Sequence, residues 1–205
     1  FKIVIAFSFS NSFIFDHPQV IFLFQISPSI LAIFIHYTLN EYYNNKKAPL
    51  KNIMNIVLFE PEIPPNTGNV IRLCANTGSK LHLIKPLGFE LDNKKLRRAG
   101  LDYREFSAIS THENFQAFIN AIKPNKIFGL STKGERKYTE VTFTDEDTFV
   151  FGPETRGLPE TIRFAIGKEN ILKIPMSKDS RSINLSNSVA IVLFEALRQT
   201  KFSSL

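Results

Sequence analysis

Apolar, strand-like runs alternate with helix-like segments throughout residues 54–205, and this alternation restricts the fold more than any other feature of the chain. The runs NIVLFE (55–60) and KLHLIK (80–85) are rich in aliphatic residues, which is typical of buried strands. Residues 183–200 carry apolar side chains at the spacing of a helix that faces a core. Because such an alternation favours parallel strands covered by helices, we expect an α/β fold whose mostly parallel sheet has helices on both faces.

The predicted elements follow one another in a simple order. We expect strands at 55–60, 80–85, 126–132, 148–152 and 170–176. We expect a loop followed by a helix within 64–78, and further helices at 91–100, 112–122, 158–166 and 183–200. Asn66 or Thr67 is the expected N-cap of the first helix, and Gly78 is expected to end it.

The composition changes near residue 53. All nine glycines lie at or after Gly68, whereas residues 1–53 contain eight of the twenty phenylalanines and no glycine. The run 20–39 is about as long as a membrane-spanning helix, which needs ~20 residues. Polar residues and a proline interrupt this run at its centre, at positions 25–29. A signal peptide is a second interpretation, but the segment lacks a clear basic start followed by a small-residue cleavage site.

A third interpretation is that residues 1–53 are upstream sequence translated in frame, and we favour it. Met54 opens a well-formed strand, and the segment before it is dominated by the residues that AT-rich DNA encodes. We therefore expect a poorly defined hydrophobic extension over 1–53 that is not part of the functional protein, and one working domain over 54–205. That domain is expected to be cytoplasmic, with no membrane contact unless 20–39 is an anchor.

Charge and cysteine usage narrow the classes of function. The formal net charge of +6 permits a polyanionic partner such as nucleic acid without demonstrating one. A single cysteine, Cys74, excludes an internal disulfide framework and a cysteine-based metal site. The four histidines lack the spacing of metal ligands, so we expect no bound metal.

The first motif is NTGNVIRLCANTG (66–78). A polar, glycine-containing helix start presents free backbone N–H groups and a partial positive charge, which can hold a phosphate or a carboxylate. Arg72 lies one to two turns into this otherwise fairly apolar helix. An ordinary capped helix with a surface arginine would give the same pattern, and both interpretations stay open at this point.

The second motif is FGPETRGLP (151–159), where an apolar strand ends in a rigid turn. Gly152 lets another group approach the backbone closely, and the proline after it restricts the turn. Glu154 and Arg156 project from this turn at the carboxyl end of a strand, where ligands usually bind in open α/β sheets. The alternative is a local ion pair, but an exposed pair stabilises by only ~0–1 kcal/mol, a weak reason for so constrained a loop.

The third motif is IPMSKDSRSINLSNSVA (174–190), a polar run between the last strand and the last helix. Asn184 or Ser186 can cap that helix, which needs only one such residue. The surplus of hydroxyl and amide groups, with Arg181 and Ser182 among them, favours a binding loop over a solvated connection. No His, Asp or Cys dyad occurs in the three motifs, which argues against hydrolase chemistry.

In this order, the three motifs closely resemble those of the SPOUT superfamily of RNA methyltransferases. Within it, the match is to the ribose 2′-O-methyltransferases, and above all to the small single-domain enzymes that modify cytidine or uridine at position 34 of tRNA. The resemblance covers essentially all of 54–205 and none of 1–53. It implies a deep trefoil knot near the C-terminus, S-adenosyl-L-methionine as methyl donor, and a homodimer.

The resemblance also implies roles for individual residues. Four match donor-binding positions of the family: Leu130, Gly152, Ile174 and Ser182. Arg72 matches the arginine assigned to catalysis, and Arg181 is expected to assist it. Contact with RNA is expected from a set of mostly basic residues: Asn66, Lys133, Glu154, Arg156, Arg97 and Arg98, with Lys94 and Lys95 in the same short helix. That helix could equally be a solvated face, and Glu154 and Arg156 could instead fasten their loop.

The implied activity is transfer of the donor methyl group to the ribose 2′-hydroxyl of the wobble nucleotide in the anticodon loop of tRNA. A single-stranded loop suits this, because its bases can be splayed out of the stack. Two alternatives stay open. The enzyme could act at another position of tRNA or on ribosomal RNA, or the chain could be a non-catalytic RNA-binding protein of the same fold.

Overall fold

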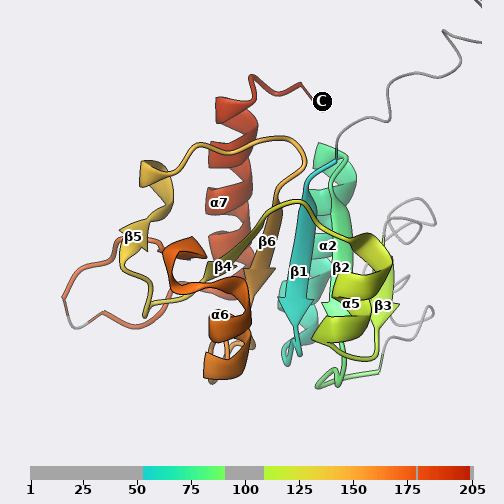
Figure 1. The fold of residues 1–205 in the computed structure, drawn as a ribbon. Coiled ribbons are helices and arrows are strands. Elements are labelled where there is room, and N and C mark those ends of the chain that lie inside the picture. The colour runs from blue at the N-terminus through green and yellow to red at the C-terminus, as the bar shows by residue number, and fades with distance from the viewer. Residues whose placement is uncertain (1–52, 91–108, 179, 204–205) are drawn as a thin grey trace, which may run out of the picture. The chain divides into compact units, whose positions relative to one another are not determined.

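A computed structural model describes residues 53–90, 109–178 and 180–203 of the chain (Figure 1). Residues 51–205 form one of two units into which the chain divides, and all the described residues belong to this unit. The apolar run 20–39 lies outside the described residues. So does the predicted basic helix 91–100, with Lys94, Lys95, Arg97 and Arg98.

A sheet of seven parallel strands forms the centre of the unit, in the order β3-β2-β1-β6-β4-β7-β5. The central strands are buried on both faces, as their apolar sequences predict. The seven strands are β1 (Asn55–Phe59), β2 (Lys80–Ile84), β3 (Ile109–His112), β4 (Ile127–Leu130), β5 (Arg136–Lys137), β6 (Thr148–Phe151) and β7 (Ile171–Lys173).

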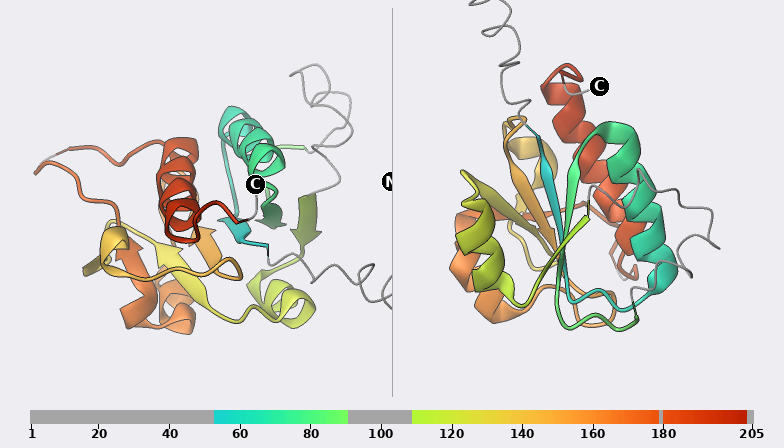
Figure 2. Two further views of the ribbon diagram at one scale, coloured as in Figure 1. Left: turned by 90° about the horizontal axis from the view of Figure 1, so that it is seen from above. Right: turned by 90° about the vertical axis from the view of Figure 1, so that its right-hand side faces the viewer.

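Helices cover both faces of this sheet, as predicted. The turned view in Figure 2 shows α2 and α7 on one face and α5 and α6 on the other. Each pair closes its own apolar cluster, one around Val70 and Val192 and the other around Phe118 and Ile166. The helices are α2 (Pro64–Thr77), α5 (Phe115–Ile122), α6 (Glu160–Ile166) and α7 (Leu185–Gln199), with short 3₁₀ turns η2 (Tyr138–Glu140) and η3 (Lys168–Asn170).

Two strands were not predicted, and both lie at the edges of the sheet. β3 is half-exposed and β5 is fully exposed, so neither carries the apolar signal of a buried strand. The predicted helix 112–122 begins later, at Phe115, because the side chain of Asn114 accepts a hydrogen bond from the Ala117 N–H at 2.8 Å and caps it. In the part of the chain that the structure describes, no helix has both the length and the apolarity to cross a membrane.

β7 inserts between β4 and β5, although β4 and β5 follow each other along the chain. The connection between them therefore passes close to β7. The Ser131 N–H donates to the Leu172 carbonyl at 2.9 Å, and a Cβ at Gly134 would lie 2.7 Å from the backbone of Leu172. This crossing fits the trefoil knot that the resemblance implies, and the knot itself stays a prediction.

The strand order also brings three carboxyl ends together. β6, β4 and β7 are neighbours, and Leu130 pairs in register with Phe151 on one side and with Leu172 on the other. The loops that follow β6 and β7 carry the second and third motifs, so residues far apart in sequence meet at the carboxyl ends of the central strands.

Candidate active site

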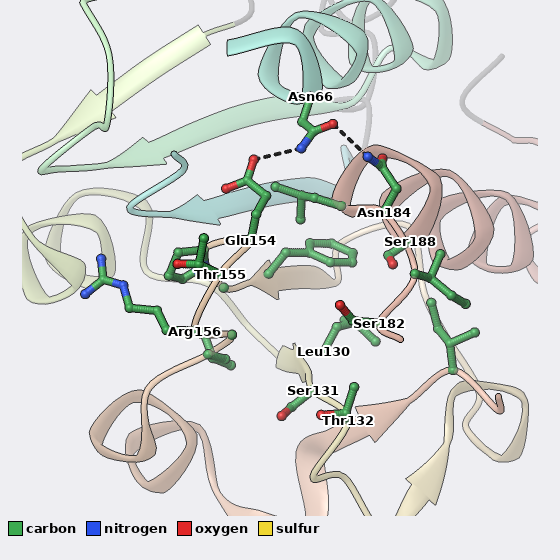
Figure 3. A pocket seen from close by; sticks show the side chains of 18 of the residues that line it. Asn66, Leu130, Ser131, Thr132, Glu154, Thr155, Arg156, Ser182, Asn184 and Ser188 are labelled. Carbon is green, nitrogen blue, oxygen red and sulfur yellow. Dashed lines mark hydrogen bonds between the residues drawn. The ribbon is translucent and has the colours of Figure 1, made fainter. Parts of the chain in front are cut away.

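A pocket of about 370 Å³ opens at the carboxyl ends of β4, β6 and β7 (Figure 3). The four residues predicted to bind a donor all line it: Leu130, Gly152, Ile174 and Ser182. Three residues predicted to contact RNA line it too: Asn66, Glu154 and Arg156. Asn184, predicted only as a helix cap, also lines the pocket, and four further polar lining residues were not predicted: Ser131, Thr132, Thr155 and Ser188.

The loop after β6 requires glycine at position 152. A Cβ there would lie 2.1 Å from the backbone nitrogen of Leu158, a distance that forbids any side chain. The loop folds back this closely because the Gly157 N–H donates to the Pro153 carbonyl at 2.9 Å and Gly157 takes a positive φ of 66°. The close approach that the glycine predicts is therefore made by the backbone of the same loop, at Gly157 and Leu158.

The pocket combines apolar walls with a few polar groups. Leu130 and Ile174 contribute aliphatic surface, and Ile63 and Met176 line it with 41% and 38% of their surface exposed. Ser131 and Ser182 also line this space (Figure 3). Concave, largely apolar sites with a small number of placed polar groups are typical of cofactor binding.

The carboxylate of Glu154 caps the start of α2. It accepts hydrogen bonds from the backbone N–H of Glu62 at 2.8 Å, from the N–H of Ile63 at 3.2 Å and from Nδ2 of Asn66 at 3.0 Å. Ile63 is the N-cap residue and its own side chain makes no cap, so Glu154 supplies the acceptor. The anion expected at this helix start is therefore one of the protein's own carboxylates, which the partial positive charge of the helix favours.

A reciprocal set of contacts fastens the same two loops. Oε2 of Glu62 accepts hydrogen bonds from the Thr155 N–H at 3.0 Å and from the Thr155 hydroxyl at 2.7 Å. Arg156 forms ion pairs with Glu60 at 2.6 Å and Glu62 at 3.4 Å. Hydrogen bonds from Thr155, reinforced by Arg156, lower the pKa of the Glu62 carboxyl. Glu154 and Arg156 thus act in fastening the loop, and a role of either in RNA contact stays a prediction.

The predicted caps of the two long helices had different outcomes. Asn184 is the N-cap of α7, as predicted, with Oδ1 accepting from the N–H groups of Ser186 at 2.9 Å and Asn187 at 3.4 Å. The predicted cap of α2 at Asn66 or Thr67 is wrong. Pro64 and Pro65 occupy the first helical positions, where a missing N–H costs nothing, so the helix begins earlier and Asn66 lies inside it.

Of the predicted cationic residues that the structure describes, Arg156 lines the pocket and the other three do not. Arg72 is exposed on α2, Lys133 is exposed just after Thr132, and Arg181 is exposed just before Ser182. None of these three is among the lining residues. The pocket is thus built mainly from aliphatic, hydroxyl and backbone groups, and positive charge lies at its margins.

Comparison with known proteins places this architecture in a family. The chain matches the SpoU rRNA Methylase family over residues 53–194. It is 56% identical over 147 residues to a tRNA (cytidine(34)-2′-O)-methyltransferase of Escherichia coli K12, covering 72% of this chain and 94% of that protein. A protein of the same name from Saccharophagus degradans is 58% identical over 151 residues, covering 74% of this chain and 98% of the relative.

Solved structures agree with the fold. A structure that concerns 2-OH methylation of C/U34 on tRNA is 43% identical, has a TM-score of 0.67, and is matched over 73% of this chain and 97% of its own. The methyltransferase AviRb from Streptomyces viridochromogenes, in complex with AdoMet, has a TM-score of 0.64 at 21% identity over 74% of this chain and 59% of its own, which supports the fold alone. From the family match, the close relatives and the shared fold together, the chain belongs to the SpoU methylase family.

Proposed function

We propose that the chain transfers the methyl group of S-adenosyl-L-methionine to the ribose 2′-hydroxyl of nucleotide 34 in tRNA. The observation that carries this proposal is the pocket, where the residues matched to donor binding come from the end of β4 and from the loops after β6 and β7 and meet in one place. This chain matches nearly the whole length of the relatives named as tRNA (cytidine(34)-2′-O)-methyltransferases, which supports the same substrate class.

The pocket fits the proposed donor by size and by chemistry. Its volume of about 370 Å³ lies within the range of sites for small organic ligands. Gly152 lines the pocket with backbone atoms, and Leu130 and Ile174 offer apolar surface to a heterocycle. S-adenosylmethionine, when bound, supplies an electrophilic methyl group on a sulfonium. Backbone and hydroxyl groups on rigid loops would hold it with little loss of conformational entropy.

The proposed role of Arg72 is to stabilise negative charge that develops on the 2′-oxygen or to hold the neighbouring phosphate. A guanidinium stays protonated at neutral pH and is therefore a poor base. Arg72 lies six residues beyond Asn66 along α2, or about 9 Å at ~1.5 Å per residue. Its exposure leaves it accessible to RNA that approaches the pocket from the side of α2.

RNA contact is proposed for the cations at the margin of the pocket. Lys133 and Arg181 each adjoin a lining residue, so they can hold phosphates on either side of an inserted nucleotide. The anticodon loop suits such a site because its unpaired nucleotides can turn outward. Arg97 and Arg98 are retained in this proposal on the sequence alone.

The working form is proposed to be a homodimer of residues 54–205, acting in the cytoplasm where tRNA is modified. Arg72 does not line the pocket of its own chain, which supports a site completed beside a second copy. Residues 1–53 are proposed to be dispensable, since the family match begins at residue 53. Sedimentation equilibrium of the purified chain would test the dimer, and a monomeric mass at micromolar concentration would contradict it.

The deciding experiment is methylation of unmodified total tRNA by the purified chain with S-adenosylmethionine. New 2′-O-methyl groups are mapped by digestion and mass spectrometry. We expect methylation at the ribose of nucleotide 34 in a small set of tRNAs. Methylation at another nucleotide would keep the chemistry and overturn the site, whereas donor binding without methylation of any RNA would favour a non-catalytic binder.

A further inference from the structure

A directed chain of hydrogen bonds links the start of α7 to the carboxylate of Glu154 (Figure 3). The Ser186 N–H donates to Oδ1 of Asn184 at 2.9 Å, and Nδ2 of Asn184 donates to Oδ1 of Asn66 at 2.9 Å. Nδ2 of Asn66 then donates to Oε1 of Glu154 at 3.0 Å. Its two bonds between side chains join residues that are 118 and 88 positions apart in the sequence, and together they connect all three sequence motifs.

The orientation of each amide in this chain is dictated by its two ends. An ionised carboxylate can only accept, so Asn66 must turn its NH₂ group towards Glu154 and its oxygen towards Asn184. The backbone N–H groups of α7 can only donate, so Asn184 must turn its oxygen towards them. The two requirements agree, and every bond runs from the positive end of a helix towards a negative charge.

We propose that Asn66 is a positioning residue, whose amide holds the loop after β6 and the loop before α7 at fixed places relative to α2. Both loops line the pocket, and α2 carries Arg72, so the amide sets the donor site against the proposed catalytic arginine. This inference rests on the proposed function. It replaces the predicted role of Asn66 in RNA contact, because the side chain is 6% exposed and both of its polar atoms are already bonded.

Exchanging a donor for an acceptor should break this chain of hydrogen bonds at a specific point. In Asn66→Asp, two carboxylates face each other where an N–H···O bond stood. In Glu154→Gln, the new NH₂ group meets a donor in either orientation, the NH₂ of Asn66 or the N–H of Glu62, because the carboxylate accepts from both. If both asparagines turn over to avoid this, the NH₂ of Asn184 meets the N–H groups of α7, and the cap is lost. A buried polar group left unpaired in this way is costly in either variant.

The combination of the two substitutions should restore the chain of hydrogen bonds. In Asn66→Asp/Glu154→Gln, the new glutamine NH₂ takes the place of Oε1 and donates to Asp at position 66, while its oxygen takes the place of Oε2 and accepts from the N–H of Glu62. The second oxygen of the aspartate still accepts from Asn184. Every bond from α7 to position 154 is matched again, with the net charge of the wild type, and the Ile63 N–H is the one donor that loses its acceptor.

The test measures S-adenosylmethionine affinity by calorimetry, together with kcat and the KM for tRNA, in the full chain and the three variants. We expect each single substitution to weaken donor binding and kcat by about tenfold or more, with the KM for tRNA within about twofold. The double variant should return to within about threefold of the wild type. Asn120→Asp and Glu146→Gln make the same changes at exposed positions elsewhere and should behave as wild type.

A double variant no better than the worse single variant would overturn the proposal. So would an Asn66→Asp variant that raises only the KM for tRNA, since that result marks an RNA ligand. Donor affinity is measured without RNA, so a failure of methylation at nucleotide 34 leaves this test intact. If the wild type binds no donor, the proposed function fails by itself. The free energies of unfolding of the same four proteins in urea then test the hydrogen-bond chain, because the two substitutions should show a favourable coupling energy.

Discussion

Arg72 is the residue on which the proposed chemistry depends most. Its guanidinium can stabilise charge that exists only in the transition state, so its loss should act on kcat and not on donor affinity. We expect Arg72→Ala to lower kcat by about 10²–10³-fold, the usual effect of removing one such donor. Calorimetry should give an unchanged affinity for S-adenosylmethionine. Normal turnover by this variant would exclude the role, and Arg198→Ala, an exposed arginine on α7, provides the control.

Gly152 and Gly68 are two glycines at which substitution by alanine should have opposite effects. A Cβ at Gly152 would lie 2.1 Å from backbone, whereas a Cβ at Gly68 would meet nothing within 4 Å. We expect Gly152→Ala to abolish donor binding and to lower the free energy of unfolding by about 1–3 kcal/mol, because the turn must move. Gly68→Ala, inside α2, should instead stabilise by about 0.5–1 kcal/mol. Urea unfolding and calorimetry measure both, and tight donor binding by Gly152→Ala would contradict the close approach.

At the scale of elements, the edge of the sheet at β2 and β3 is held by a buried histidine. Nδ1 of His82 lies 3.1 Å from Nε2 of His112, and Nε2 of His82 lies 3.1 Å from Oδ1 of Asn55. Burial, with the nearby charges of His112 and Lys80, lowers the pKa of His82 from 6.5 to about 4. The neutral ring is therefore the form that the folded state requires.

The sign of the pH effect follows from this lowered pKa. Above pH 6.5 the ring is neutral in both states, and below it the unfolded chain takes up the proton first. Stability due to His82 should therefore be lost as the pH falls from 6.5 towards 4, by an amount of order 3 kcal/mol. The measurement is urea unfolding of the wild type and His82→Gln at a series of pH values. A difference between the two that does not change over this range would show that the ring is not buried neutral.

Most elements could be predicted from the sequence, and those that could not share a physical reason. β1 and α7 have a strong local pattern, because their apolar residues face a core at a regular spacing. β5 has two exposed residues and exists only because β7 offers it a partner. The start of α2 was misplaced for a related reason, since its cap is a carboxylate 92 residues away in the sequence.

At the scale of the whole molecule, residues 54–205 should suffice for folding and methylation. Met54 is 2% exposed, and its carbonyl accepts from the Lys80 N–H at 3.0 Å, so the boundary cannot lie later. We expect the chain that begins at Met54 to match the full chain in thermal midpoint and in kcat with tRNA. An insoluble or inactive product would show that residues 1–53 contribute to the functional protein.

Local sequence was sufficient to predict the α/β class, the order of the buried strands and the three loops that carry polar or glycine-rich motifs, because each depends on neighbouring residues. It also singled out Leu130, Gly152, Ile174 and Ser182, which the fold brings to one pocket. Only the tertiary structure decided which side chains join those loops. Glu154 meets the start of α2, and Asn66 meets Asn184, because the strand order places β6 beside β1 and returns α7 to the face that α2 covers. Hydrogen bonds over such separations leave no local pattern, since a donor carries no mark of the distant acceptor that it will find.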